Sequence, residues 1–154
     1  MKRVSSILLA FLLVAAAAVH AQDKPNFVGT WKLSDPAQPD MFTATQMVVS
    51  QDATLLTVVT TGQMGEFKTT YKLDGSVGQS PLDFQGNLIE RNTKATWNDK
   101  KLTLTTTSDM GGQTIEFKSV VSLGDDGSLT VESTFPDFQG GGAPITQKAI
   151  YKKA

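Results

Sequence analysis

The sequence predicts an all-β protein, an antiparallel up-and-down β-barrel of eight to ten strands. Three observations lead to this prediction. Apolar and polar residues alternate with period two, tight-turn residues separate the alternating stretches at short intervals, and no helical period exceeds about two turns. Because closure of a sheet into a barrel removes its exposed edges, we favour a barrel, and a two-sheet sandwich is the alternative.

The clearest expected strand covers residues 66–73. Phe67, Thr69, Tyr71 and Leu73 share one face of it, whereas the opposite face carries charged and polar side chains. The same alternation, bounded by turn residues, recurs along the chain. The nine expected strands cover residues 27–33, 44–50, 54–60, 66–73, 88–97, 101–107, 113–123, 128–134 and 145–152.

The first 21 residues have the composition of a cleavable export signal. A basic start precedes an unbroken apolar run over residues 7–19, and a small-x-small cleavage site ends at Ala21. The apolar run is too short to span a bilayer comfortably, and no second apolar stretch follows it. We therefore expect a signal peptide at 1–21, one β-barrel domain at 22–154, no membrane-spanning segment after cleavage, and a periplasmic or extracellular location.

Composition excludes several classes of function. The chain has no cysteine, and its single histidine, His20, lies in the expected signal. The remaining residues therefore lack the groups for Ser-His-Asp or Cys-His catalysis and for the usual zinc, haem or iron–sulfur sites. The formal net charge is -1 without any basic run, which argues against nucleic acid as a partner. We expect no enzyme activity, no catalytic residues, no metal and no cofactor.

The chain also contains an internal two-fold sequence repeat. Short identical motifs recur in the same order about 50 residues apart, although chance matches among threonine- and glycine-rich strands are the alternative explanation. Two copies of a four-stranded unit would build an eight-stranded barrel. The paired motifs are Glu66-Phe67-Lys68 with Glu116-Phe117-Lys118, Asp74-Gly75-Ser76 with Asp126-Gly127-Ser128, Asp83-Phe84-Gln85-Gly86 with Asp137-Phe138-Gln139-Gly140, and Lys94-Ala95 with Lys148-Ala149.

The first expected strand, residues 27–33, reads FVGTWKL. Its Gly-x-Trp pattern at the start of an all-β chain resembles the calycins, the lipocalin and fatty-acid-binding protein group, and most of all the bacterial secreted lipocalin-like domains that open with GTWKL. The resemblance implies a barrel with Trp31 packed across one closed end. Residues 150–154 are similar to the closing strand of a fatty-acid-binding protein, but Ala149 stands where that family has its carboxylate-binding arginine, and residues 34–43 are too short for its two-helix lid.

Large side chains on the apolar faces of the expected strands form a candidate ligand-binding site. A barrel of eight strands is just wide enough to be filled by side chains or to hold one small ligand, so these residues are either plain core or the lining of an apolar cup. Arg91, the only arginine after residue 21, could bind a carboxylate with two hydrogen bonds or form a solvated surface pair with a nearby acid such as Glu90. The resemblance to lipocalins implies a cation that caps Trp31, and Lys148 could take that role, although alternation places Lys148 on the opposite face from Ala149 and Tyr151. The candidate binding residues are Phe67, Tyr71, Arg91, Trp97, Phe117 and Tyr151.

Two functions therefore compete. The first is an exported barrel that binds a small apolar or amphipathic ligand, and the second is a filled barrel that binds a protein partner through its surface. Phe84 and Phe138 lie in glycine-containing loops, where they could cover the barrel mouth or form an exposed apolar edge for a partner. An outer-membrane barrel is disfavoured, because one face of the best strands carries lysine and glutamate rather than apolar residues.

Overall fold

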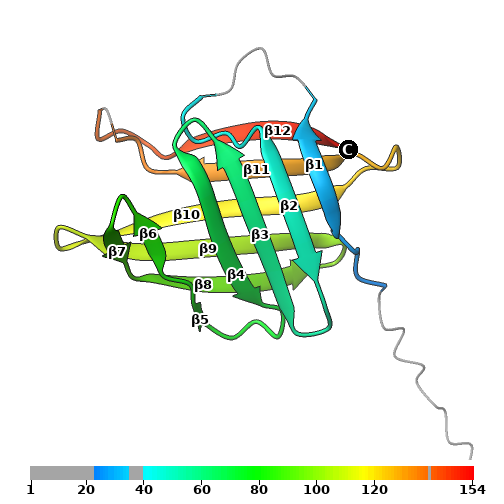
Figure 1. Ribbon diagram of the computed structural model, residues 1–154, viewed down its shortest axis with the longest axis horizontal. Helices are drawn as coiled ribbons and strands as arrows, with labels where there is room; N and C mark the ends of the chain where they lie inside the picture. The colour runs from blue at the N-terminus through cyan, green and yellow to red at the C-terminus, as the bar shows by residue number, and fades with distance from the viewer. Residues whose placement is uncertain (1–22, 35–39, 139) are drawn as a thin grey trace, which may run out of the picture.

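The computed structural model describes residues 23–34, 40–138 and 140–154 (Figure 1). All the regular structure in these residues is β, and none of them is helical. Ten strands form one antiparallel sheet that curls into a nearly closed barrel, which confirms the all-β barrel prediction. The expected signal at 1–21 lies outside the described residues.

The main sheet follows the chain order except at two places: the C-terminal strand pairs beside the first one, and β5 pairs with β8. Its strand order is β4-β3-β2-β1-β12-β11-β10-β9-β8-β5, and β6 and β7 form a separate hairpin. In Figure 1, β1 to β4 cross in front of the layer formed by β8 to β12. The strands are β1 (Gly29–Leu33), β2 (Gln46–Gln51), β3 (Leu55–Gly62), β4 (Gly65–Lys72), β5 (Gly78–Gln79), β6 (Leu82–Phe84), β7 (Asn87–Ile89), β8 (Arg91–Asn98), β9 (Lys101–Met110), β10 (Gln113–Leu123), β11 (Leu129–Phe135) and β12 (Ile145–Lys153).

The barrel closes between β4 and β8, along a line that we call the seam. β5 is only two residues long, so side chains connect the two strands in place of a continuous backbone ladder. The Thr70 backbone N–H donates to Ser80 Oγ at 3.1 Å, and Thr93 Oγ1 donates to the Thr70 carbonyl oxygen at 2.8 Å. These bonds satisfy strand-edge groups that would otherwise be unpaired.

All nine expected strands are present, and the structure adds β5, β6 and β7. The expected strand at 88–97 is in fact two strands, because Glu90 separates Asn87–Ile89, which pairs with Leu82–Phe84, from Arg91–Asn98. Strands of two or three residues are too short for a period-two pattern to be recognised. The two Asp-Gly-Ser turns carry the same Asp-to-Ser hydrogen bonds, but they precede strands of different length, and the internal repeat stays a prediction.

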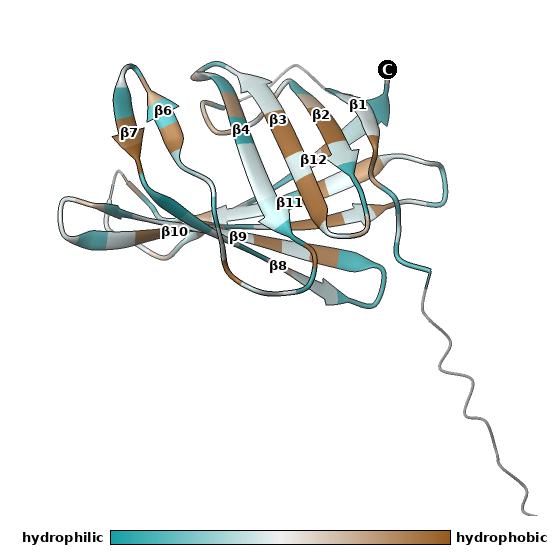
Figure 2. Ribbon diagram, turned by 60° about the horizontal axis from the view of Figure 1, so that its bottom comes forward, coloured by the Kyte–Doolittle hydropathy of each residue, from teal (hydrophilic) through white to brown (hydrophobic). Residues whose placement is uncertain are grey.

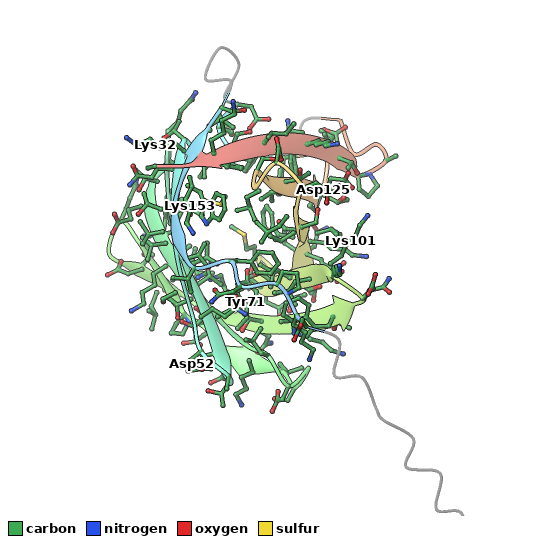
Figure 3. All side chains as sticks on the ribbon, turned by 90° about the vertical axis from the view of Figure 1, so that its right-hand side faces the viewer. Lys32, Asp52, Tyr71, Lys101, Asp125 and Lys153 are labelled. Atoms are coloured by element: carbon green, nitrogen blue, oxygen red, sulfur yellow. The ribbon has the colours of Figure 1, made fainter. Side chains whose placement is uncertain are left out.

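One end of the barrel is packed shut, and we call it the closed end. The chain before β1 crosses this end, which faces the viewer in Figure 3. Phe27 and Trp31 are 1% and 2% exposed, and Trp31 Nε1 donates to the Phe27 carbonyl oxygen at 2.8 Å. The Phe27 ring stacks on Trp97 of β8 at 5.9 Å between centroids. Trp31 therefore lies across a closed end, the position that the resemblance to calycins implied for it.

The cation near Trp31 is Lys153 rather than Lys148. Lys153 Nζ lies 5.5 Å from the Trp31 ring centroid, a distance typical of a cation–π contact. Lys148 is exposed on the outer face of β12, because the alternation along this strand directs it away from the interior. A Cβ at Gly29 would lie only 2.6 Å from Lys153 Cε, so the glycine of the Gly-x-Trp pattern leaves room for the lysine stem.

Candidate ligand-binding cavity

The barrel interior contains two adjoining cavities. The inner cavity has a volume of about 190 Å³ and extends from Phe27 at the closed end to the middle of the barrel. The outer cavity has a volume of about 550 Å³ and is lined by both hairpin tips, Met64-Gly65 and Met110, at the opposite end, which we call the mouth. The residues that line both cavities are Phe42, Thr43, Ala44, Thr60 and Thr69.

Apolar side chains dominate the inner wall of the barrel. Figure 2 shows hydrophobic stretches on β2 and β3 and on the hairpin of β6 and β7, which stands beside the mouth. The alternation along β2, for example, buries Met47 and Val49 against the inner cavity and leaves Val48 and Ser50 outside. The period-two pattern of the sequence thus produces the apolar lining.

Both tyrosine hydroxyls of the inner cavity are hydrogen-bonded within the protein. The Tyr71 hydroxyl lies 3.0 Å from Thr106 Oγ1, and the Tyr151 hydroxyl donates to the Ala44 carbonyl oxygen at 2.9 Å. Burial raises the pKa of Tyr71, and burial together with the negative charge of Asp40 raises the pKa of Tyr151 to about 12. Both phenols are therefore neutral at physiological pH, and the inner cavity suits an uncharged part of a ligand.

Asp40 lies beside this cavity and is held as a carboxylate. Partial burial would raise its pKa, but hydrogen bonds from the Thr43 hydroxyl, the Gln147 amide and the backbone N–H groups of Phe42 and Thr43 outweigh burial and lower the pKa. The Gln147 contact ties the segment before β2 to β12. Because these donors satisfy the Asp40 charge, this carboxylate acts as a structural group.

Five phenylalanines line the outer cavity and form two groups. On one wall, Phe67 of β4 and Phe84 of β6 have ring centroids 6.1 Å apart. On the other, Phe138 lies 5.7 Å from Phe42 and 6.1 Å from Phe117 of β10. These distances and tilts are those of favourable aromatic pairs. The two groups, which we call the two aromatic walls, enclose most of the mouth.

Arg91 is the charged residue in the lining of the outer cavity. Its Nε donates to the Ser80 carbonyl oxygen at 2.9 Å, and its Nη2 donates to the Lys68 carbonyl oxygen at 3.1 Å and to Thr69 Oγ1 at 3.2 Å. The side chain thus crosses the seam. Burial lowers the pKa of the Arg91 guanidinium, and only the ionised form of the Tyr71 phenol would oppose this effect. Its hydrogen-bond partners are two backbone carbonyl oxygens and one hydroxyl, and none of them belongs to an acidic side chain.

Five of the six candidate binding residues line the two cavities. Phe67, Arg91 and Phe117 line the outer cavity, and Tyr71 and Tyr151 line the inner one. Trp97 lies in neither lining, because the chain before β1 covers it and Phe27 stacks on its ring. Within the described residues, the buried Trp97 Nε1 has no hydrogen-bond partner. Trp97 is thus a closed-end residue, and we withdraw it from the candidate site.

The sequence pattern missed a second set of lining residues. Met41 and Phe42 come from an irregular segment before β2, where no periodicity indicates an inward direction, and Met64 and Met110 lie at hairpin tips. Only the tertiary fold brings these segments to one opening. Phe84 and Phe138 do line the mouth, which was one of the two positions expected for them.

No protein-family model and no curated protein sequence matches this chain. The resemblance to calycins therefore stays a prediction. In the described part of the chain, no helix is long and apolar enough to cross a membrane. The same residues contain no group of three or more His, Cys, Asp or Glu side chains that could hold a metal ion.

Proposed function

We propose that this protein binds a small apolar or amphipathic molecule inside its barrel. The observation that supports this function is the outer cavity of about 550 Å³, which opens at the mouth and adjoins the inner cavity. Ligand pockets in proteins commonly have volumes of about 300–1,000 Å³, apolar walls and a few polar groups. The hydroxyls of the inner cavity and the Arg91 guanidinium supply such groups.

The second candidate function is a protein-interaction module with a filled barrel. A filled interior would leave no cavity, so the volume inside the barrel counts against this function. The mouth nevertheless exposes apolar side chains, with Met41 54% and Phe138 52% exposed. An exposed apolar rim suits either the entry of a ligand or a contact with a protein, and the binding experiment below distinguishes them.

We also propose that the chain is exported after removal of residues 1–21, as their charge and apolar pattern suggest. The test is the N-terminal sequence and the mass of the protein isolated from its host. A mature chain beginning at Gln22 supports export. A chain that retains Met1 and stays in the cell contradicts it.

Two measurements test the binding function. Native mass spectrometry of the protein purified from its host would detect a retained molecule that is lost on denaturation. Fluorescence titration with N-phenyl-1-naphthylamine, a neutral apolar probe, would measure binding to residues 22–154. We expect saturable binding of one probe molecule per chain.

A matched pair of variants assigns the probe to the cavity. Thr60 lines both cavities, whereas Lys68 is exposed on the neighbouring strand. Thr60→Trp should fill the junction and weaken probe binding about tenfold, at an overpacking cost of about 1–3 kcal/mol in stability. Lys68→Trp should leave the affinity unchanged. No retained molecule and no probe binding by the unaltered protein would overturn the proposal and favour the interaction module.

A further inference from the structure

The walls of the outer cavity indicate the chemical class of its ligand. Each aromatic wall is held together by its own ring contacts, Phe67 with Phe84 on one wall and Phe42, Phe117 and Phe138 on the other. Among the described residues, no ring contact joins the two walls. The space between them is bounded by aromatic faces and edges, which attract another flat ring system through offset or edge-to-face packing.

Methionine side chains add to this preference. Met41, Met64 and Met110 line the same cavity and come from three separate segments. The thioether sulfur is polarisable and makes favourable contacts with aromatic rings, and the unbranched side chain adapts its shape to the molecule it touches. Sulfur and aromatic groups therefore surround the space from several sides.

Arg91 stands between the two walls. It is the first residue of β8. On one side of β8 lies the seam with β4, and β4 carries Phe67. On the other side β9 follows and then β10, which carries Phe117. Its three hydrogen bonds at the seam use three of the five N–H groups of a guanidinium. Among the described residues, the two N–H groups on Nη1 have no protein partner.

The Arg91 charge is also unbalanced within the described part of the chain. Its hydrogen-bond partners are two backbone carbonyl oxygens and one hydroxyl, and none is a carboxylate. Burial lowers the Arg91 pKa, and the side chain that opposes this effect is the Tyr71 phenol, which is itself neutral at physiological pH. A half-buried cation in an apolar wall is stabilised by an anion that accepts its remaining N–H groups.

We infer that the ligand is a flat aromatic molecule with one anionic group, a carboxylate or sulfonate, whose rings lie between the two aromatic walls and whose anion binds Arg91. This inference rests on the proposed binding function and names its ligand class. The aromatic walls would recognise the rings and Arg91 would recognise the anion, so two comparisons test these contacts separately.

The first comparison isolates the charge. 8-Anilinonaphthalene-1-sulfonate and N-phenyl-1-naphthylamine share one aromatic skeleton and differ by the sulfonate. We expect the sulfonate to bind about tenfold more tightly, the effect of a charge-assisted hydrogen bond, and this preference to shrink as salt rises. Arg91→Gln should remove the preference, and Arg91→Lys should retain part of it. Lys94→Gln is the matched control, because it removes a positive charge from the exposed face of the same strand.

The second comparison isolates the rings. 2-Naphthoate and undecanoate carry the same carboxylate and the same number of carbon atoms, and both can displace the bound sulfonate probe. We expect naphthoate to compete about fivefold better, because it alone can stack between the walls. Phe117→Leu should reduce this ratio, since leucine keeps an apolar side chain of similar size but removes the ring.

The outcomes separate this inference from the binding function. If neither probe binds, the binding function fails and the ligand class fails with it. If both probes bind with equal affinity at all salt concentrations, the cavity binds ligands but Arg91 does not recognise an anion. If undecanoate competes as well as naphthoate, the aromatic part of the inference is wrong. The salt dependence is measured on the unaltered protein, so the charge test remains decisive even if Arg91→Gln does not fold.

Discussion

The two ends of the barrel use the same residue types for different purposes. At the closed end, Phe27 and Trp31 are almost fully buried, and Phe27 stacks on Trp97. Lys153 lies over the Trp31 ring, and Lys24 lies over the Trp97 ring. At the mouth, the rings contact one another in two walls and leave a cavity of about 550 Å³ between them. Aromatic content alone therefore does not distinguish a core from a binding site.

The difference lies in what covers the rings. The segment before β1 is anchored across the closed end, because Gln51 accepts from the Phe27 backbone N–H at 3.0 Å and donates to the Pro25 carbonyl oxygen at 3.3 Å. At the mouth, hairpin tips and loops surround the opening without filling it. We expect substitutions at the closed end to cost stability and substitutions at the mouth to cost affinity.

The largest effect is expected for Trp31→Ala. The variant loses a buried ring, the hydrogen bond to Phe27 and the contact with Lys153, so its free energy of unfolding should fall by about 3–5 kcal/mol. Urea denaturation followed by circular dichroism measures the change. Trp31→Phe keeps most of the apolar contact and should lose less. Unchanged stability of Trp31→Ala would show that the closed end does not stabilise the fold, and it would undermine the resemblance to calycins.

The next largest effect concerns the two tyrosines of the inner cavity, between the two ends. Burial raises the pKa of both, that of Tyr151 to about 12. The folded state holds these protons more tightly than the unfolded state does. The contribution of the protonated phenols to the free energy of unfolding is therefore complete below the ordinary tyrosine pKa of about 10, and it is lost as the pH rises toward 12. We expect a loss of roughly 2 kcal/mol from Tyr151 over that window.

Absorbance of tyrosinate measures this directly, since the chain has only two tyrosines. The folded protein should show almost no ionisation at pH 10, whereas the protein in urea should be half-ionised there. Tyr151→Phe should leave one tyrosine with a raised pKa and make the alkaline loss of stability smaller. Normal titration of both phenols in the folded protein would mean that water reaches the inner cavity freely from the mouth.

A smaller effect is expected at the seam, which connects the two ends along one side. Thr93 is 1% exposed, and Thr93→Val keeps its shape but leaves the Thr70 carbonyl oxygen without its 2.8 Å hydrogen bond. The loss of stability should be about 1–2 kcal/mol. Thr96→Val, an exposed position on the same strand, is the control and should change little. Equal effects of both substitutions would mean that the Thr93 bond does not hold the barrel closed.

The contrast between the two ends also explains how far the sequence could predict the structure. Period two identifies which residues point inward, so the longer strands and four of the candidate lining residues, Phe67, Tyr71, Phe117 and Tyr151, could be found without coordinates. The same pattern cannot say how far along the barrel axis a residue lies. Trp97 and Phe67 are equally inward by alternation, but Trp97 is covered by the chain before β1 and Phe67 faces the cavity.

Residues outside regular strands were harder to place. Phe42 lies in the segment before β2, where apolar and polar residues do not alternate. Its ring nevertheless contacts Phe117, Phe135 and Phe138. Arg91 was a candidate because of its residue type, but its bonds across the seam depend on β5 being too short to complete the sheet. Such contacts follow from tertiary closure, which local periodicity does not describe.

The smallest effect on stability is expected at the mouth, for Phe138→Ala. Phe138 is 52% exposed, so the free energy of unfolding should change by less than about 0.5 kcal/mol. Its ring is part of an aromatic wall, so affinity for the naphthylamine probe should fall about threefold. Phe135 lies three positions earlier and is 5% exposed, and Phe135→Ala should instead cost about 3 kcal/mol in stability. The opposite result for Phe138→Ala, a loss of stability with unchanged probe affinity, would mean that the mouth stabilises the fold and does not bind the ligand.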